Sequence, residues 1–429
     1  MRQLFSKVIY NVGFGGNVCF IDILGGAGDA TFIESSGNFY AIPVAVAGTF
    51  RNLVVRSQTT HPDATVTLMH GIDVQRAVPS MTASALSVFL GSGDVEVSDT
   101  SDELTVVAGE YVALRMQMAG AGAGFIMGFS VEFEAAEQTY GIRTTEGHIS
   151  GQRQGGSLGN GGFTEVLGPP PANDSNTYSV NAVPGVIKRL VLGAELPVTI
   201  GDVTGYIRLN GTIQDGSGGT VNTTCVVAGP LGIYTSVFDL PIAVTDHVET
   251  VLFKNGGAEF ISVTTSIGFL PDDGASFMLC GGSNQVLGTY AWTLTEQSTM
   301  DVNEAVAPVG PRGLVALGLY GQMGAGGTSG IFQVSLFKDE VITAITFGIN
   351  VAGNNRDGFI LATVPFAAGS TMTLNLPTGS FGQLHWGLAA VFPDEPSGGG
   401  IVVPSPACPP GFLPTAVSGG SGCPTGLFP

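Results

Sequence analysis

The chain contains one pattern that catalysis could use, Gly155-Gly156-Ser157-Leu158-Gly159, which matches the G-x-S-x-G motif of hydrolases. In those enzymes a sharp turn between a strand and a helix exposes the serine as a nucleophile. Here the motif lies in a glycine-rich stretch of a chain with 65 glycines, and no helix is indicated after it. We therefore expect a chance match and no catalytic serine.

The histidines give no stronger signal for an enzyme. None has a second histidine four residues away on a helix, the spacing that a zinc-protease motif needs. We expect structural roles for all of them and predict that the chain is not an enzyme. The positions are His61, His70, His148, His247 and His385.

An acidic run from Asp94 to Glu103 offers carboxylates of the kind that bind calcium. The run lacks the glycine-turn order of an EF-hand loop, so we expect a solvated acidic loop. The sequence predicts no metal site and no cofactor.

The five cysteines lie at irregular positions, Cys19, Cys225, Cys280, Cys408 and Cys423, without a paired C-x-x-C. Threonines and valines surround Cys225, which predicts a small buried thiol. Cys408 and Cys423 lie in a Gly/Pro-rich tail, where a disulfide between them or between neighbouring chains would order the segment. Free thiols are the alternative for this pair.

Three similar segments organise the chain. Arg51, Lys188 and Arg312 each follow a turn of Val, Ala, Pro and Gly residues and lead into a short apolar run. These basic markers are 137 and 124 residues apart, a period too long for a solenoid repeat. The spacing predicts whole β domains in tandem.

Two further features recur in the same order after each basic marker. Paired strands with an apolar residue at every second position occupy residues 104–114, 240–250 and 364–374. A closing strand then ends at Phe133, Phe269 and Phe392. The 65 glycines and 24 prolines disfavour helices, while Val, Thr, Ile and Phe fill the alternating runs. We predict an all-β chain of three tandem antiparallel sandwiches, jelly-roll-like, with the immunoglobulin type as the alternative.

The repeats predict the domain boundaries. The sandwiches are expected at residues 33–138, 174–273 and 298–395, with a connector at 274–297. Residues 1–32 are expected to form an anchoring arm, and residues 139–173 a linker that is rich in Gly and Pro. Residues 396–429 are a Gly/Pro/Cys tail that cannot bury enough apolar area to fold alone.

The charge balance and the apolar segments limit the possible partners and cellular locations. With 15 Lys and Arg against 34 Asp and Glu, the net charge of −19 disfavours nucleic acid and anionic membranes as partners. No run of about 18 apolar residues is present to cross a bilayer. Arg2 and Lys7 precede an apolar stretch as in a signal peptide, but Asn11, Asn17 and Asp22 interrupt it, so we expect no cleaved signal.

The repeated unit, from the basic marker through the paired strands to the closing strand, resembles the sandwich domains of tailed-bacteriophage virion proteins that decorate heads or form fibres. The resemblance covers roughly residues 33–395. It implies assembly on a capsid or tail in a virion, commonly as trimers, with other virion proteins as partners and no catalysis.

Two other functions fit parts of the pattern. A secreted bacterial adhesin or filament subunit would use the same sandwiches at the cell surface. A carbohydrate-binding protein would need stacking platforms, and two Trp and nine Tyr provide few.

The mature N-terminus separates the virion hypothesis from secretion. We expect N-terminal sequencing to begin near residue 1, because no continuous apolar signal segment is present. Cleavage near Ala27 or Ala30 would instead favour the cell-surface hypothesis.

Overall fold

The computed structural model describes residues 2–9, 18–21, 32–33, 41–57, 61–72, 74–75, 78–79, 81–119, 126–136, 138–139, 142–143, 147–148, 153–158, 163–165, 179–180, 182–194, 196–283, 290–291, 306–323, 331–350, 357–375 and 384–394. Within these ranges the only helical segment is a three-residue 3-10 turn, Ser217–Gly219. All ladders between the strands are antiparallel, which confirms the predicted all-β class. None of the described segments is a helix long and apolar enough to cross a membrane.

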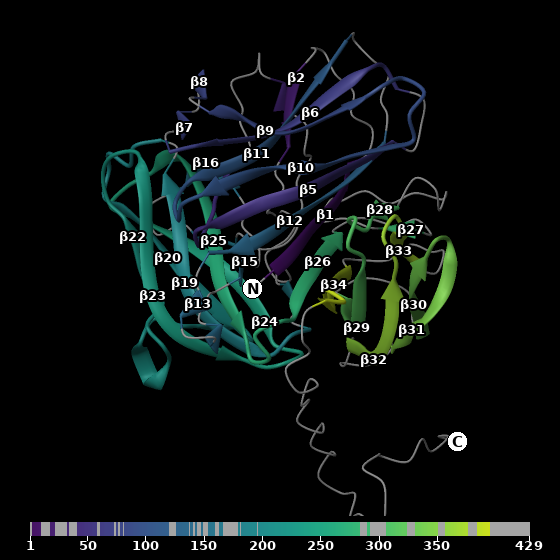
Figure 1. Cartoon of the computed structure of the whole chain (residues 1–429). Helices are drawn as coiled ribbons and strands as arrows, with labels where there is room; N and C mark the ends of the chain where they lie inside the picture. The colour runs from purple at the N-terminus through teal and green to yellow at the C-terminus, as the bar shows by residue number, and fades with distance from the viewer. Residues whose placement is uncertain are drawn as a thin grey trace, which may run out of the picture. The chain divides into compact units, whose positions relative to one another are not determined.

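Three sandwiches follow one another along the chain (Figure 1). The strands of sandwich 1 are β1 (Arg2–Ile9), β2 (Val18–Ile21), β3 (Phe32–Ile33), β4 (Ile42–Pro43), β5 (Gly48–Ser57), β6 (Ala64–Gly71), β9 (Thr82–Leu90), β10 (Glu96–Val106), β11 (Tyr111–Met118) and β12 (Met127–Ala135). A hairpin of β7 (Val74–Gln75) and β8 (Val78–Pro79) lies between β6 and β9 in the chain.

The next two sandwiches repeat this plan. After a small hairpin of β13 (Gln138–Thr139) and β14 (Ile142–Arg143), sandwich 2 comprises β15 (Gly147–His148), β16 (Arg153–Leu158), β17 (Phe163–Glu165), β18 (Ser179–Val180), β19 (Gly185–Ala194), β20 (Asp202–Leu209), β21 (Thr212–Ile213), β22 (Cys225–Val227), β23 (Gly232–Ile242), β24 (His247–Asn255) and β25 (Glu259–Pro271). Sandwich 3 comprises β26 (Phe277–Ser283), β27 (Tyr290–Ala291), β28 (Ala307–Pro308), β29 (Leu314–Met323), β30 (Ile331–Lys338), β31 (Val341–Asn350), β32 (Asp357–Phe366), β33 (Thr371–Asn375) and β34 (Leu384–Val391).

The strand order identifies a jelly roll in each sandwich. Short strands that pair with the same neighbour are counted here as one, so each sandwich has eight strand positions. One sheet holds the first, eighth, third and sixth strands: β1-β12-β5-β10, β16-β25-β19-β23 and β26-β34-β29-β32. The other holds the second, seventh, fourth and fifth strands: β2-β11-β6-β9, β17-β24-β20-β21 and β27-β33-β30-β31. Two such sheets from eight strands form the jelly-roll arrangement rather than the immunoglobulin one.

The sandwiches begin earlier in the chain than the sequence analysis predicted. The predicted arm contains β1, which pairs with β12 from Arg2 opposite Glu134 to Ile9 opposite Met127. The predicted linker contains β16, which pairs with β25, and the predicted connector contains β26, which pairs with β34. Glycine and polar residues in these first strands hide the alternation by which later strands are recognised. The tail at 396–429 lies outside the described residues.

The closing phenylalanines fix how each third strand begins. A Cβ on Gly48 would lie 2.4 Å from the Phe133 ring, and a Cβ on Gly185 would lie 2.7 Å from the Phe269 ring. In sandwich 3 the guanidinium of Arg312 instead lies 5.8 Å from the centroid of the Phe392 ring. Arg312, the third basic marker, therefore lies beside its closing phenylalanine at the position that glycine occupies in sandwiches 1 and 2. The other two markers, Arg51 and Lys188, lie within β5 and β19.

Filling the space beside Phe133 tests this packing. We expect Gly48→Val to destabilise sandwich 1 by about 1–3 kcal/mol, because the added methyl groups overlap the ring. Gly93→Ala is the control, since no atom lies within 4 Å of its added Cβ. The midpoints of urea unfolding, followed by circular dichroism, measure both effects. Equal midpoints for the two variants would contradict the account.

Candidate functional site

The structure places the hydrolase-like motif in an ordinary strand. Gly155 to Leu158 belong to β16, where Ser157 lies opposite Phe260 of β25. A nucleophile elbow needs a strained turn into a helix, and a regular ladder position does not provide one. The expectation of a chance match is consistent with this placement.

The histidines that can be located have separate partners. His61 Nδ1 and Nε2 lie 2.8 and 3.1 Å from the backbone oxygens of Pro62 and Asp94. His70 Nδ1 lies 2.8 Å from Glu110, and His247 Nε2 lies 3.1 Å from the Tyr320 hydroxyl. His148 and His385 lie in β15 and β34, and their side chains are outside the described part.

The acidic run is mostly a strand rather than a loop, because residues from Glu96 onward form β10. Asp99 is buried at a register shift of β10 and accepts hydrogen bonds from the backbone N–H groups of Ser87, Ser101 and Asp102. These bonds hold the pKa of Asp99 low, against the opposing effect of burial. Among the described residues no three His, Cys, Asp or Glu side chains form a group that could hold a metal ion.

Cys225 is a buried free thiol, as predicted, and Cys19 is another. Burial raises the pKa of each thiol to about 12, so neither supplies a reactive thiolate at neutral pH. The side chain of Cys280 is not described, and Cys408 and Cys423 lie outside the described residues, so their proposed disulfide stays a prediction. Trp386 is buried in sandwich 3 and offers no stacking platform for a sugar, while Trp292 is not described.

The residues of one sandwich meet those of the next in a cyclic order. The short strand before each third strand makes these contacts. In sandwich 1 it is β4, which lies beside β25 and β19 of sandwich 2. In sandwich 2 it is β18, beside β34 and β29 of sandwich 3, and in sandwich 3 it is β28, beside β12 and β5 of sandwich 1. Each short strand therefore meets the eighth and third strands of the next sandwich, and we call these the 1–2, 2–3 and 3–1 contacts.

The hydrophobic cores follow the same cycle. The core of sandwich 1 includes Val191 from β19, and the core of sandwich 2 includes Tyr320 and Ala389 from β29 and β34. The core of sandwich 3 includes Leu4 and Val8 from β1. Adjacent residues on these strands point into the core of their own sandwich. The sheet of first, eighth, third and sixth strands is therefore covered on both faces around its eighth strand.

Small side chains on the eighth strands permit this double coverage. A Cβ on Gly128 would lie 2.7 Å from the backbone oxygen of Val306 in sandwich 3. Ser130 on β12 and Ser266 on β25 are fully buried, and Ala389 on β34 is nearly so. A large side chain at these positions would push the neighbouring sandwich away.

The 1–2 and 2–3 contacts use the same position for an aromatic ring. Tyr111 and His247 are the first residues of the seventh strands β11 and β24. The Tyr111 hydroxyl lies 2.2 Å from where a Cβ of Gly193 would be, so a larger residue at 193 would displace the ring. In the 2–3 contact, His247 instead lies against the Tyr320 ring, with a centroid separation of 6.3 Å.

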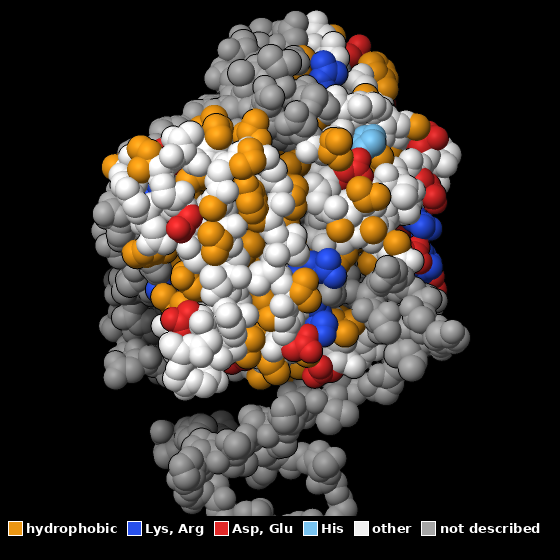
Figure 2. All heavy atoms as spheres, turned by 90° about the vertical axis from the view of Figure 1, so that its left-hand side faces the viewer, with side chains coloured by type: hydrophobic (Ala, Val, Ile, Leu, Met, Phe, Trp, Pro, Cys, Tyr) orange, Lys and Arg blue, Asp and Glu red, His pale blue; other side chains and the backbone are white. Residues whose placement is uncertain are grey.

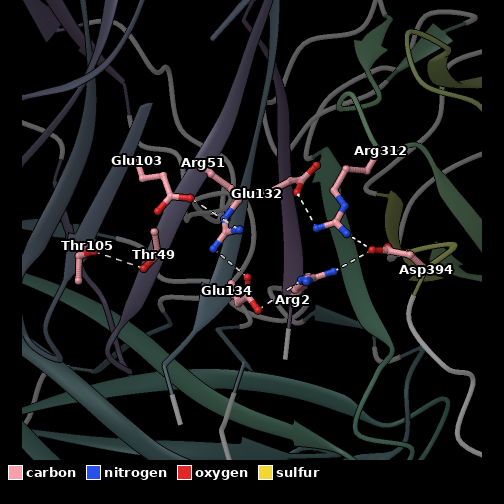
Figure 3. Close-up of polar contacts among 9 residues, drawn as sticks. All are labelled: Arg2, Thr49, Arg51, Glu103, Thr105, Glu132, Glu134, Arg312 and Asp394. Carbon is pink, nitrogen blue, oxygen red and sulfur yellow. Dashed lines mark hydrogen bonds and ion pairs between the residues drawn. The ribbon is translucent and has the colours of Figure 1, made fainter. Parts of the chain in front are cut away.

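Ion pairs cross the 3–1 contact in addition to its apolar residues (Figure 3). Arg2 Nη1 lies 3.0 Å from Oδ2 of Asp394, which also pairs with Arg312. Arg312 Nη1 lies 4.0 Å from Oε2 of Glu132 on β12. On the sandwich 1 side the network continues through Arg2, Arg51, Glu103 and Glu134. We call these seven residues the ionic cluster: Arg2, Arg51, Glu103, Glu132, Glu134, Arg312 and Asp394.

Glu132 is the buried acid of this cluster, with 2% of its surface exposed. Burial raises the pKa of its carboxyl group, while the nearby Asn52 side chain and the charges of Arg312, Arg2 and Arg51 oppose that shift. Counting back from the closing phenylalanines, the matching positions are Gly268 and Val391. The other two contacts therefore have no carboxylate at this place.

Arg51 and Arg312 stand out in the sequence as markers of a repeat, but the sequence does not indicate that they take part in a contact between sandwiches. Their acidic partners Glu132 and Asp394 lie in or just after closing strands that the sequence also indicates. One signal was available, because Glu132 is a lone acid in an otherwise uncharged run from Gly128 to Phe133. A charge inside such a strand requires a partner, and the partner lies on another sandwich.

The fifth and sixth strands carry exposed apolar side chains. They form the edge of each sandwich that lies farthest from its first and second strands. Figure 2 shows such side chains on the face on the left of Figure 1, where β22 and β23 of sandwich 2 lie: hydrophobic side chains form rows with few charged side chains among them. The large exposed apolar residues in or directly beside these strands are Phe89, Val95, Val107, Val226, Val237, Val341, Ile342 and Leu361. Exposed apolar surface of this kind is suited to contact with other proteins.

The chain matches no protein-family model and no curated protein. Among solved structures, a chain in the structure of infectious bursal disease virus, Gx strain, aligns with 91% of this chain and 80% of its own length. The two are 10% identical, with a TM-score of 0.15.

Replacing Glu132 tests the assignment of its buried charge. Because the folded-state pKa is raised, protonated Glu132 favours folding below the unfolded pKa, and this contribution is lost as the pH rises through the folded pKa. Glu132→Gln does not titrate, so its stability relative to the unmodified chain should rise between about pH 4 and about pH 8. Urea unfolding at both pH values measures the difference. A relative stability that falls over this interval would contradict the assignment.

Proposed function

We propose that the chain is a non-enzymatic structural protein of a virion, a bacteriophage capsid-decoration, head-fibre or other surface protein that binds the shell through protein contacts. The observation that carries this proposal is the cyclic order of the 1–2, 2–3 and 3–1 contacts. Head-to-tail contacts that close on themselves are the rule in cyclic homo-oligomers. Here three jelly rolls of one chain make them, and jelly rolls are a fold of viral capsid proteins.

The free edges support assembly with partners. The contacts of the cycle involve the short second strands and the first, third, seventh and eighth strands, together with Ile233 at the start of β23. The fifth strands and the rest of the sixth strands carry exposed apolar residues. The apolar residues exposed there, such as Val237 at 70% and Val341 at 65%, suit a protein partner better than a polar small molecule. The partners that we propose are the major capsid or tail protein, together with further copies of the chain.

Purified particles test this function. Particles from cultures that produce the protein are banded on a density gradient, and each fraction is examined by mass spectrometry and by immunogold labelling with an antibody against the chain. We expect the chain to band with the particles and the antibody to label their outside. A chain found only in the particle-free or cell-wall fraction would contradict a virion role and favour an adhesin or filament.

A further inference from the structure

We propose that the 3–1 contact is an ionic latch in which Arg312 holds the cycle closed, and that rising ionic strength opens the cycle there before the other two contacts. The inference concerns the chain itself and does not depend on the proposed function. It rests on chain connectivity, on the chemistry of the three contacts and on the solvent exposure of the ionic cluster.

Chain connectivity makes the 3–1 contact the one that can separate most freely. The 1–2 and 2–3 contacts join sandwiches that follow each other in the chain. The 3–1 contact joins the two ends of the described chain, Arg2 in β1 and Asp394 just after β34. A direct chain connection keeps two surfaces at high effective concentration, and sandwiches 3 and 1 have this only through sandwich 2.

The three contacts also differ in chemistry. In the 2–3 contact, the backbone N–H of Ala182 donates to the sulfur of Met278 at 3.3 Å, and His247 meets Tyr320. In the 1–2 contact, Tyr111 lies against Gly193. The 3–1 contact has apolar residues, Leu4 and Val8, and two ion pairs cross it, Arg2 with Asp394 and Arg312 with Glu132.

Salt can reach the ion pairs that cross the 3–1 contact. The side chains of Arg2, Arg312 and Asp394 retain 24%, 26% and 49% of their exposed surface. Mobile ions weaken the attraction between exposed charges, and the Debye length falls from about 10 Å at 0.1 M to about 3 Å at 1 M salt. Glu132 lies beneath these pairs, so loss of Arg312 leaves a buried carboxylate with one fewer opposing charge.

Arg312 contacts acidic side chains of both sandwich 3 and sandwich 1. It extends from the turn closed by the hydrogen bond from Gly313 N to Gly310 O, stacks on Phe392, and pairs with Asp394 of its own sandwich. From this position it reaches Glu132 on sandwich 1. Asp394 in turn reaches Arg2 on sandwich 1, so a single side chain orients both ionic connections.

Hydrogen exchange on the full chain tests the latch, with mass spectrometry of peptides that cover the contact strands. Between about 0.05 M and about 1 M sodium chloride, we expect exchange to become about fivefold faster in β1 and β28. The equivalent short strands are β4 in the 1–2 contact and β18 in the 2–3 contact. They serve as internal controls. Their exchange should change little.

A variant and its matched control separate the latch from a general salt effect. Arg312→Ala should give the fast exchange of β1 and β28 already at low salt, whereas Lys188→Ala should behave like the unmodified chain. Lys188 is also a basic marker, but it pairs with Asp239 inside sandwich 2. Unchanged exchange in β1 and β28, or equal acceleration of β4, β18 and β28, would overturn the proposal. The salt series on the unmodified chain decides the question if Arg312→Ala does not fold.

Discussion

The arrangement depends on covering one sheet of each jelly roll from both sides. The outward positions of the eighth strands carry small side chains such as Gly128, Ser130, Ser266 and Ala389, and these are buried. Burial of this face requires a close partner, because packed protein interiors leave little empty space. The neighbouring sandwich provides that partner, so the contacts between sandwiches and the interior of each sandwich are parts of one packing problem.

The same constraint accounts for the asymmetry of each sandwich. Where the neighbour covers the eighth strand, nearly every residue is buried, as in β12. The second half of the sixth strand β23 lies beyond the contact that Ile233 makes with sandwich 1, and burial alternates there. The exposed apolar residues lie on the fifth and sixth strands, away from the eighth strand. Each jelly roll therefore has one side committed to the cycle and another side available for assembly.

Much of the fold could be predicted from the sequence, because residues repeated three times in the same order are a strong signal. The alternating strands around Val112, Val248 and Met372 and the closing strands gave the fold class and the number of sandwiches. The first strands could not be recognised, since strands such as β16, with Gly155 and Gly156, lack apolar alternation. Their place is set by pairing with eighth strands about a hundred residues later.

The contacts between the sandwiches were less accessible to prediction. A basic residue before an apolar run indicates a repeat, but the partner of Arg312 depends on which sandwich lies opposite. The third marker even occupies a different place from Arg51 and Lys188, over Phe392 where the other sandwiches have Gly48 and Gly185 beside a ring. Sequence similarity between the markers therefore concealed a difference in role, and only the three-dimensional contacts separate them.

Cross-linking across the 3–1 contact tests most directly whether one chain closes the cycle. A Cβ on Gly310 would lie 3.6 Å from Cδ1 of Leu4, so thiols introduced by Leu4→Cys and Gly310→Cys lie close to one another, and oxidation or a short bismaleimide can be used to link them. We predict a linked pair of peptides, containing positions 4 and 310, within chains that migrate as monomers. Absence of this link, or its formation only between chains, would contradict the account.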